Sequence, residues 1–391
     1  MNHRLRAIGL ILILTLPALG ASQIVAPYVK GTMEIRPDPE FGKDTDWLRF
    51  IQGEINGLAV APDGSLFLTQ QKAHVIHKFD RSGRLVKSFG RKGQGPGDFQ
   101  FPQFLSILDE RFLVVGEQGE SRRISLFDLD GTFVKLMKTG RNPFMVTALR
   151  DGIVAYIVKS FPRRGSLVLV DSQVILLDTA TGLETAICPH SDFVSEDQVF
   201  ASPGGAPPKG EFGTGTMVIA RISCGDLAVG YTTSPKIKVF SPSGKAIREI
   251  VLDYPPLEWT DEIWSRWQEA QIETMIERTP QSDPKAIRQR ISARPRLSRL
   301  IPYFHDILSD GEGRLLVVRR GECFRSCDRE IRIYSPEGLF LSPLILREGA
   351  HTIEFDTRSR NLIFAPEALY GVFRVKNSPD DDRVLLRVPY R

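Results

Sequence analysis

The chain has 391 residues, of which 42% are hydrophobic and 25% are charged, and its formal net charge is +4. This composition is typical of a folded globular protein and excludes a largely disordered chain. The small positive excess gives no reason to expect a nucleic-acid partner, because such partners are bound by a marked excess of basic residues.

The first twenty residues have the pattern of a secretory signal peptide. Arg4 and Arg6 precede the apolar run 7–16, and the small residues Ala18 and Gly20 follow it. The run is too short to span a bilayer comfortably. We therefore expect cleavage after Gly20, no transmembrane helix in the mature chain, and a secreted or periplasmic protein.

The four cysteines fit an exported protein, because thiols tend to be oxidised outside the cytosol. Cys323 and Cys327 lie close together between two apparent strands and could bridge within a hairpin tip. Cys188 and Cys224 either pair over a longer span or are small buried side chains. Without neighbouring His residues, the spacing of Cys323 and Cys327 argues against structural zinc.

Residues 21–54 form an N-terminal segment with two strand-like runs, 32–35 and 47–51. After it, the stretch 55–102 holds four apolar runs of period two, separated by turns rich in Gly, Asp and Pro. Such a unit predicts a four-stranded antiparallel meander. The loop 90–99 is too rich in Gly and Pro for a strand, so we expect it to carry the chain to the next unit.

The same pattern recurs along the rest of the chain. We place the further units at residues 103–142, from 144 to about 182, and at 217–252, 303–346 and 351–390. Repeats of this length with four strands each predict an all-β, six-bladed β-propeller spanning residues 55–391, which we expect to be monomeric. Closing the ring covers the open edges of the first and last blades, so one N-terminal strand is expected to pair with unit six. The sequence does not decide which of the two.

Three segments, 62–64, 79–83 and 93–99, resemble the NHL-type six-bladed β-propellers of exported bacterial proteins. The resemblance covers nearly the whole mature chain, although the motif at 93–99 occurs once and units three and six are degenerate. It implies a propeller used for binding. Members of the family differ in activity, so the function has to be argued from sites.

Residues 257–300 interrupt the strand pattern with an expected helical hairpin between blades four and five. Thr260 is positioned to cap a first helix with apolar residues at helical spacing, and Asp283 and Pro284 begin a second helix. We expect the first helix to lie against the propeller rim with Trp264 or Trp267 inward. The basic residues of the second helix are either a docking stripe for an acidic partner or lipid headgroups, or a solvated face; they include Arg288, Arg290 and Arg294.

Loops between blades share one face with the insert, and this face is the candidate ligand-binding surface. In the loop 93–99 the candidates are Gln94 and Asp98, although the glycines there also serve the turn between blades. Near the mouth of the central channel we expect four polar side chains, which are either ligand-binding or structural: Asn56, His305, Asp306 and His351. Trp264 is a recognition residue or part of the packing of the insert.

These features predict an exported binding or scaffold protein that recognises a peptide, glycan or protein partner and needs no cofactor. The alternative is a channel-mouth lyase or lactone hydrolase with a divalent metal, using His305 and His351. A metal site needs three or more ligands, and lactonase-like calcium sites need carboxylates around the channel. The aligned positions offer one Asn and no carboxylate, which disfavours the alternative.

Overall fold

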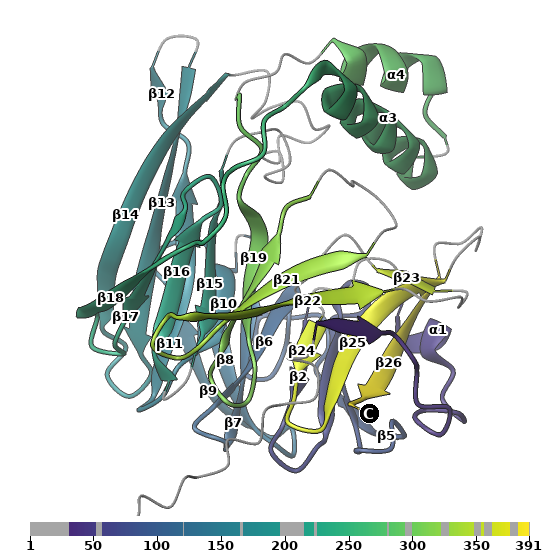
Figure 1. Ribbon diagram of the computed structural model, residues 1–391. Coiled ribbons are helices and arrows are strands. Elements are labelled where there is room, and N and C mark those ends of the chain that lie inside the picture. Colours follow the sequence, from purple (N-terminus) through teal and green to yellow (C-terminus); the bar gives the residue numbers. More distant parts are fainter. Residues whose placement is uncertain are drawn as a thin grey trace, which may run out of the picture.

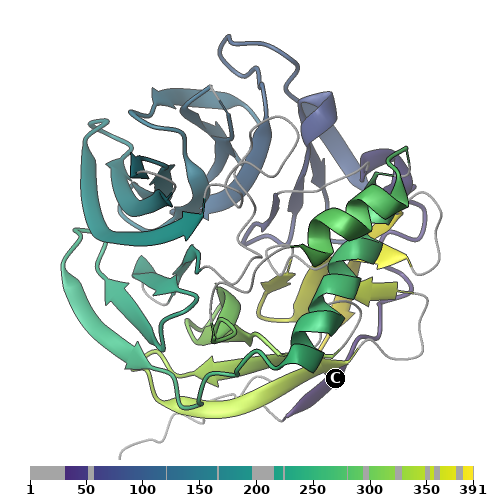
Figure 2. The ribbon, with the colours of Figure 1, turned by 90° about the horizontal axis from the view of Figure 1, so that it is seen from above.

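The computed structural model describes twelve segments of the chain: residues 31–51, 57–119, 121–164, 167–195, 215–222, 225–279, 281–293, 299–321, 328–347, 353–355, 362–375 and 382–390. Six sheets are arranged as the blades of a β-propeller, and Figures 1 and 2 show the ring from the side and from above. Several sequence predictions lie outside these residues: the signal peptide, Asn56, Cys224, Arg294, Cys323, Cys327 and His351.

Four blades are four-stranded meanders at the positions expected from the sequence, each with consecutive antiparallel strands. The first sheet contains β2 (Leu58–Val60), β3 (Leu66–Gln70), β4 (Val75–Phe79) and β5 (Leu85–Phe89), and the second β6 (Pro102–Leu108), β7 (Phe112–Glu117), β8 (Arg123–Asp128) and β9 (Phe133–Lys138). The fourth contains β15 (Met217–Arg221), β16 (Leu227–Tyr231), β17 (Lys236–Phe240) and β18 (Ala246–Val251), and the fifth β19 (Phe304–Ser309), β20 (Leu315–Arg319), β21 (Arg329–Tyr334) and β22 (Phe340–Arg347).

The third sheet differs from the expected unit. The unit was placed from 144 to about 182, but its last strand lies beyond that limit, at Glu184–Ser195, and pairs with one long strand, Leu167–Asp178. Both strands rise on the same side of the ring as the helical insert (Figure 1). The strands are β10 (Phe144–Ala148), β11 (Ile153–Ser160), β12 (Arg163–Arg164), β13 (Leu167–Asp178) and β14 (Glu184–Ser195).

In the sixth sheet, β23 (Ile353–Phe355) and β24 (Leu362–Phe364) pair end to end with the same edge of β25 (Ala368–Val375). The other edge of β25 pairs with β26 (Arg383–Pro389). Strand β24 contacts both β2 and β19, the innermost strands of the neighbouring blades. The ring of innermost strands is therefore closed by β24.

The prediction for the N-terminal segment was wrong. Strand β1 (Thr32–Glu34) pairs in parallel with the outer edge of β22 in the fifth sheet, not with unit six. The run 47–51 begins with the helix α1 (Trp47–Phe50). Its apolar residues Trp47, Phe50 and Ile51 are three and four positions apart, which favours one face of a helical turn over an alternating strand.

The segment between β1 and α1 joins three blades from the outside. After β1 on the fifth sheet, the Asp38 amide donates to the Arg387 carbonyl of the sixth sheet at 2.8 Å, and the two side chains form an ion pair. The Gly42 amide then donates to the Ser82 carbonyl of the first sheet at 2.8 Å. A Cβ on Gly83 would lie 2.8 Å from the Gly42 nitrogen, so this close crossing requires glycine. The segment thus links the fifth, sixth and first blades in addition to the closure made by β24.

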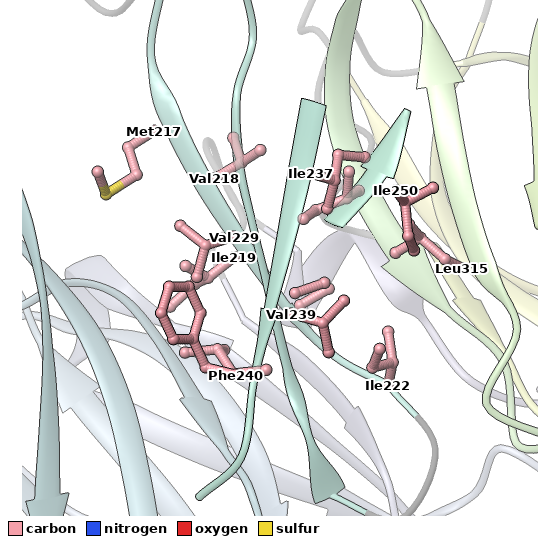
Figure 3. Packing of buried hydrophobic residues seen from close by; sticks show 14 of the residues in the cluster. Met217, Val218, Ile219, Ile222, Val229, Ile237, Val239, Phe240, Ile250 and Leu315 are labelled. Carbon is pink, nitrogen blue, oxygen red and sulfur yellow. The ribbon is translucent and has the colours of Figure 1, made fainter. Parts of the chain in front are cut away.

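Apolar side chains fill the space between adjacent sheets. Figure 3 shows this packing around the fourth sheet, where Val239 and Ile250 lie among residues of the neighbouring blades. Between the first and sixth sheets, Trp47 and Phe50 pack on Phe79 with ring centroids 5.0 and 5.4 Å apart. Helix α1 is thus part of the propeller core.

His77 on β4 makes the stability depend on pH. Its ring nitrogens hydrogen-bond to Ser88 Oγ at 2.7 Å and Gln70 Oε1 at 2.9 Å, and Phe50 packs on its edge. Burial, together with the nearby charge of Arg49, lowers the pKa of His77 from 6.5 to about 4. As the pH falls below 6.5, the unfolded chain binds a proton that the folded protein does not bind until about pH 4.

Stability contributed by neutral His77 is therefore fully present above pH 6.5 and is lost between pH 6.5 and 4. We expect the wild type to lose about 2 kcal/mol more unfolding free energy over this window than the variant His77→Gln, after allowing for partial solvent screening. Urea unfolding at pH 7 and pH 4 measures the difference. Parallel loss in both proteins would show that His77 is not the group responsible.

Candidate functional site

The helical insert lies between β18 and β19, between the fourth and fifth blades as predicted. It consists of α3 (Asp261–Arg278) and α4 (Pro284–Ser292). The expected caps are present, since Thr260 Oγ1 accepts from the Ile263 amide at 3.1 Å and Asp283 Oδ1 accepts from the Lys285 amide at 3.0 Å. Seen from above, the helices lie over the side of the ring that holds the yellow strands of the sixth sheet (Figure 2).

The two ends of the insert form a short antiparallel stem. The Trp259 amide donates to the Arg299 carbonyl at 2.9 Å, and the Ile301 amide donates to the Leu257 carbonyl at 2.8 Å. Because each chain end bonds the other, the insert leaves and re-enters the propeller at one point. The stem thus presents the helices as a single unit.

Below the stem, a charged and aromatic cluster holds the insert to the fifth blade. The Arg332 guanidinium pairs with the Asp253 carboxylate, which also accepts from the Tyr334 hydroxyl at 2.6 Å. Burial alone would raise the pKa of Asp253, but the hydrogen bonds from Arg332 and Tyr334 hold it below its ordinary value. The Tyr254 hydroxyl donates to the Tyr303 carbonyl at 3.0 Å, so residues on both sides of the insert are connected.

The first helix buries one of its two tryptophans. Trp267 is fully buried, as expected for an inward residue, and among the described residues its apolar neighbours come from the insert and its stem. This small core contains Trp259, Ile263 and Ile301. Trp264 is half-buried and stacks on Trp267 with ring centroids 4.7 Å apart, so its position is that of a packing residue. The amphipathic spacing predicted a buried face but could not specify which surface covers it.

The second helix packs on the first through Ile272, Ile287 and Ile291. Its basic residues differ in their surroundings. The Arg288 guanidinium donates to both carboxylate oxygens of Glu269, at 2.7 and 2.9 Å, and this contact raises the pKa of Arg288. Arg290 is exposed. The ion pair with Glu269 therefore neutralises part of the predicted basic stripe. The exposed charge of Arg290 remains available to a partner.

The loop 93–99 is held by a buried ion pair that the sequence analysis missed. Arg123 on β8 is 5% exposed and pairs with Glu117 on β7, which is 0% exposed. Arg123 also donates to the carbonyls of Gly93, Gln94 and Asp98 at 3.0 to 3.1 Å. The available signal was a Glu that ends one strand and an Arg that begins the next, because two opposite charges on paired strand ends can partner each other.

Asp98 has a structural role within this loop. Its carboxylate accepts from Arg91 Nε at 2.8 Å and from the Gly95 amide at 3.2 Å, and the contact with Arg91 lowers the pKa of Asp98. A Cβ on Gly93 would lie 2.3 Å from Asp98 Oδ2, so the glycine is required by this packing. The proposed ligand role of Gln94 and Asp98 therefore competes with their role in shaping the loop.

At the insert-side end of β19, His305 lies beside a cation. Arg320 Nη1 is 2.7 Å from His305 Nδ1 and 3.0 Å from Nε2. Burial, with the charges of Arg320 and Arg329, holds the pKa of His305 well below its usual range. The adjacent Asp306 is 4% exposed and accepts from the Ile307 amide. Among the residues that the structure places, no group of three or more His, Cys, Asp or Glu side chains is arranged to hold a metal ion.

The far end of the channel is crossed by a side chain. Arg221, the last residue of β15 in the fourth sheet, donates from Nη1 to the Ile107 carbonyl of β6 in the second sheet at 3.2 Å. These two sheets are separated by the third, so Arg221 spans the inside of the ring. Since β15 starts on the insert side, the crossing lies at the opposite end. Arg221 therefore links the fourth and second sheets at the end of the channel away from the insert.

Two further sequence predictions can be placed. Cys188 on β14 is half-buried and forms no disulfide with any described residue, and burial raises the pKa of its thiol. None of the helices in the described segments is long and apolar enough to cross a membrane.

Neither a protein-family model nor any curated protein matches the sequence, so the NHL-type resemblance is not confirmed. A streptogramin B lyase structure is 15% identical over 85% of this chain and 83% of its own, with a TM-score of 0.41. A member of the DUF4221 family from Bacteroides vulgatus is 10% identical over 87% and 92%, with a TM-score of 0.46. A calcium-binding protein, regucalcin, from Agrobacterium tumefaciens is 10% identical over 92% and 97%, with a TM-score of 0.37. At these values the function has to be argued from the residues of this chain.

Proposed function

We propose that this chain is an exported binding or scaffold protein that recognises a peptide, glycan or protein partner on the face bearing the insert. The observation that carries the proposal is the construction of the insert. Among the residues that the structure describes, its apolar side chains cluster around Trp267 and around Ile272, while the blades are filled by other clusters. A unit that contributes so little to the propeller core is best explained as a recognition element on a rigid scaffold.

Two other features support this face as the binding surface. The long hairpin of β13 and β14 rises on the same side as α3 and α4 (Figure 1), so the face carries two projections. Arg221 crosses the channel at the opposite end. A partner that approaches the insert-bearing face meets the projections and the inter-blade loops together.

The metalloenzyme alternative finds less support in the geometry. Both ring nitrogens of His305 face the Arg320 guanidinium, and a cation at this position repels a divalent metal. Asp306, the nearest carboxylate in sequence, is buried and accepts a backbone hydrogen bond. We therefore do not assign a lyase or lactone hydrolase activity to the channel mouth.

Shortening the insert tests the proposal. The Trp259 amide and the Arg299 carbonyl are 2.9 Å apart, so a two-residue Asn-Gly turn can replace residues 260–298. Both proteins are immobilised and exposed to an extract of the native envelope, and the retained molecules are compared. We expect the shortened chain to lose its specific partner while its strand circular dichroism and unfolding midpoint stay close to those of the wild type. Equal retention by both chains contradicts the proposal.

A further inference from the structure

A small hollow lies on the flank of the ring, between the second and third blades. Its floor is one face of the third sheet, because alternate residues of a strand project to the same side. Tyr156 pairs with Ile175 on the next strand, and Ile175 pairs with Ala186 on the one after, so these three side chains form a row. The connection after β9 lines one side of the hollow with Gly140 and Arg141.

The hollow has a volume of about 230 Å³, roughly the space of eight water molecules. Pockets for drug-sized ligands start at about 300 Å³, so this one is suited to a smaller molecule. Its floor is apolar at Val158 and Ile175, and its rim carries Arg141, Gln173 and Glu184. A cation and an anion beside an apolar floor restrict the chemistry of a matching ligand.

Glu184 is held in position before any ligand arrives. Its Oε1 accepts from the Tyr156 hydroxyl at 2.6 Å and from the Gly140 amide at 3.1 Å. A Cβ on Gly140 would lie 3.1 Å from Glu184 Oε2, so the glycine lets the carboxylate approach the backbone closely. Burial and the neighbouring Glu184 raise the pKa of Tyr156, so this hydroxyl remains a donor.

The other polar groups of the rim are not engaged by the described part of the protein. Glu184 Oε2, the Arg141 guanidinium and the Gln173 carboxamide form no hydrogen bond or ion pair with any residue that the structure places. We infer that the hollow between the second and third blades binds a small zwitterion, an α-amino acid with a short apolar side chain. Its ammonium group donates to Glu184, its carboxylate accepts from Arg141, and its side chain covers Val158 and Ile175.

This inference concerns a different surface from the proposed partner face and stands independently of it. Calorimetric titration with three compounds separates the two charged contacts. L-Leucine carries both charged groups, 3-methylbutylamine lacks the carboxylate, and 4-methylpentanoate lacks the ammonium group. We expect Glu184→Gln to weaken leucine and the amine by about tenfold or more, and Arg141→Gln to weaken leucine and the acid similarly. Glu249→Gln, on the outer strand of the fourth blade, serves as the matched control and should bind as the wild type does.

A second variant tests the hollow without changing the hydrogen bonds of Glu184. Ala186 is exposed on the outer strand β14, so Ala186→Trp fills the hollow without removing any of its polar contacts. It should abolish leucine binding while leaving the unfolding midpoint nearly unchanged. The inference is overturned if the wild type shows no saturable binding of leucine, or if Glu184→Gln, Arg141→Gln and Ala186→Trp all bind it as the wild type does.

Discussion

Replacing Arg123 with Met should lower the unfolding free energy by about 3 to 5 kcal/mol, because Glu117 would be left as a buried carboxylate without its cation. The variant also removes the donor to three carbonyls of the loop 93–99. That loop connects the first two blades, so its loosening should appear as faster amide exchange in residues 90–101. Urea unfolding at pH 7 measures the energy, and exchange mass spectrometry locates the effect.

Arg91→Met is the matched control for this prediction. Arg91 also bonds to the loop through Asp98, but its side chain is 82% exposed, so the loss should stay below about 1 kcal/mol. The double variant Glu117→Leu with Arg123→Met removes both charges and should recover part of the stability, since no unpaired charge remains buried. A loss below 1 kcal/mol for Arg123→Met alone would show that the pair does not hold the loop.

Trp267→Ala should destabilise the insert by about 3 to 5 kcal/mol, because it removes the largest fully buried side chain of a small core. The chain has four tryptophans, and three of them lie in the insert, so tryptophan fluorescence mainly reports on it. Circular dichroism mainly reports on the strands. In the variant, the fluorescence transition should occur at a lower urea concentration than the loss of strand signal.

The control for Trp267 is its stacked neighbour Trp264. Trp264 is only half-buried, so Trp264→Ala should cost less and shift the fluorescence transition by a smaller amount. Coincident fluorescence and circular dichroism transitions in Trp267→Ala, both at reduced urea, would mean that the insert is part of the propeller's cooperative unit. The view of the insert as a separate module would then be wrong.

The blades could be predicted from the sequence because the residues that define each strand and each turn lie close together in the chain. Each strand shows a period of two, and each turn carries residues that satisfy its own backbone. The Asp80 carboxylate accepts from the Ser82 amide at 2.8 Å, and the Asp128 carboxylate accepts from the Asp130 amide at 2.9 Å. The helices of the insert were predictable for the same reason, since their caps lie within three residues of the groups they bind.

The errors came from contacts between distant residues. The partner of β1 is more than three hundred positions away, and nothing in residues 32–34 distinguishes the edge of β22 from that of another blade. Helix α3 showed an apolar face, but its packing on Trp259 and Ile301 depends on the position of the stem, which the local pattern does not specify. The candidate site also depends on tertiary pairing, because Arg320 lies fifteen residues from the His305 that it contacts.

Site-specific photo-crosslinking tests the central claim most directly, namely that partners bind the insert-bearing face. A photoreactive amino acid is placed at Arg290 on α4, at Lys92 in the inter-blade loop, or at Glu312 in a turn on the opposite face. The three proteins are irradiated in the native envelope and the adducts are resolved by mass. Adducts at positions 290 and 92 without adducts at 312 are the expected result, and adducts formed mainly at position 312 would contradict the account.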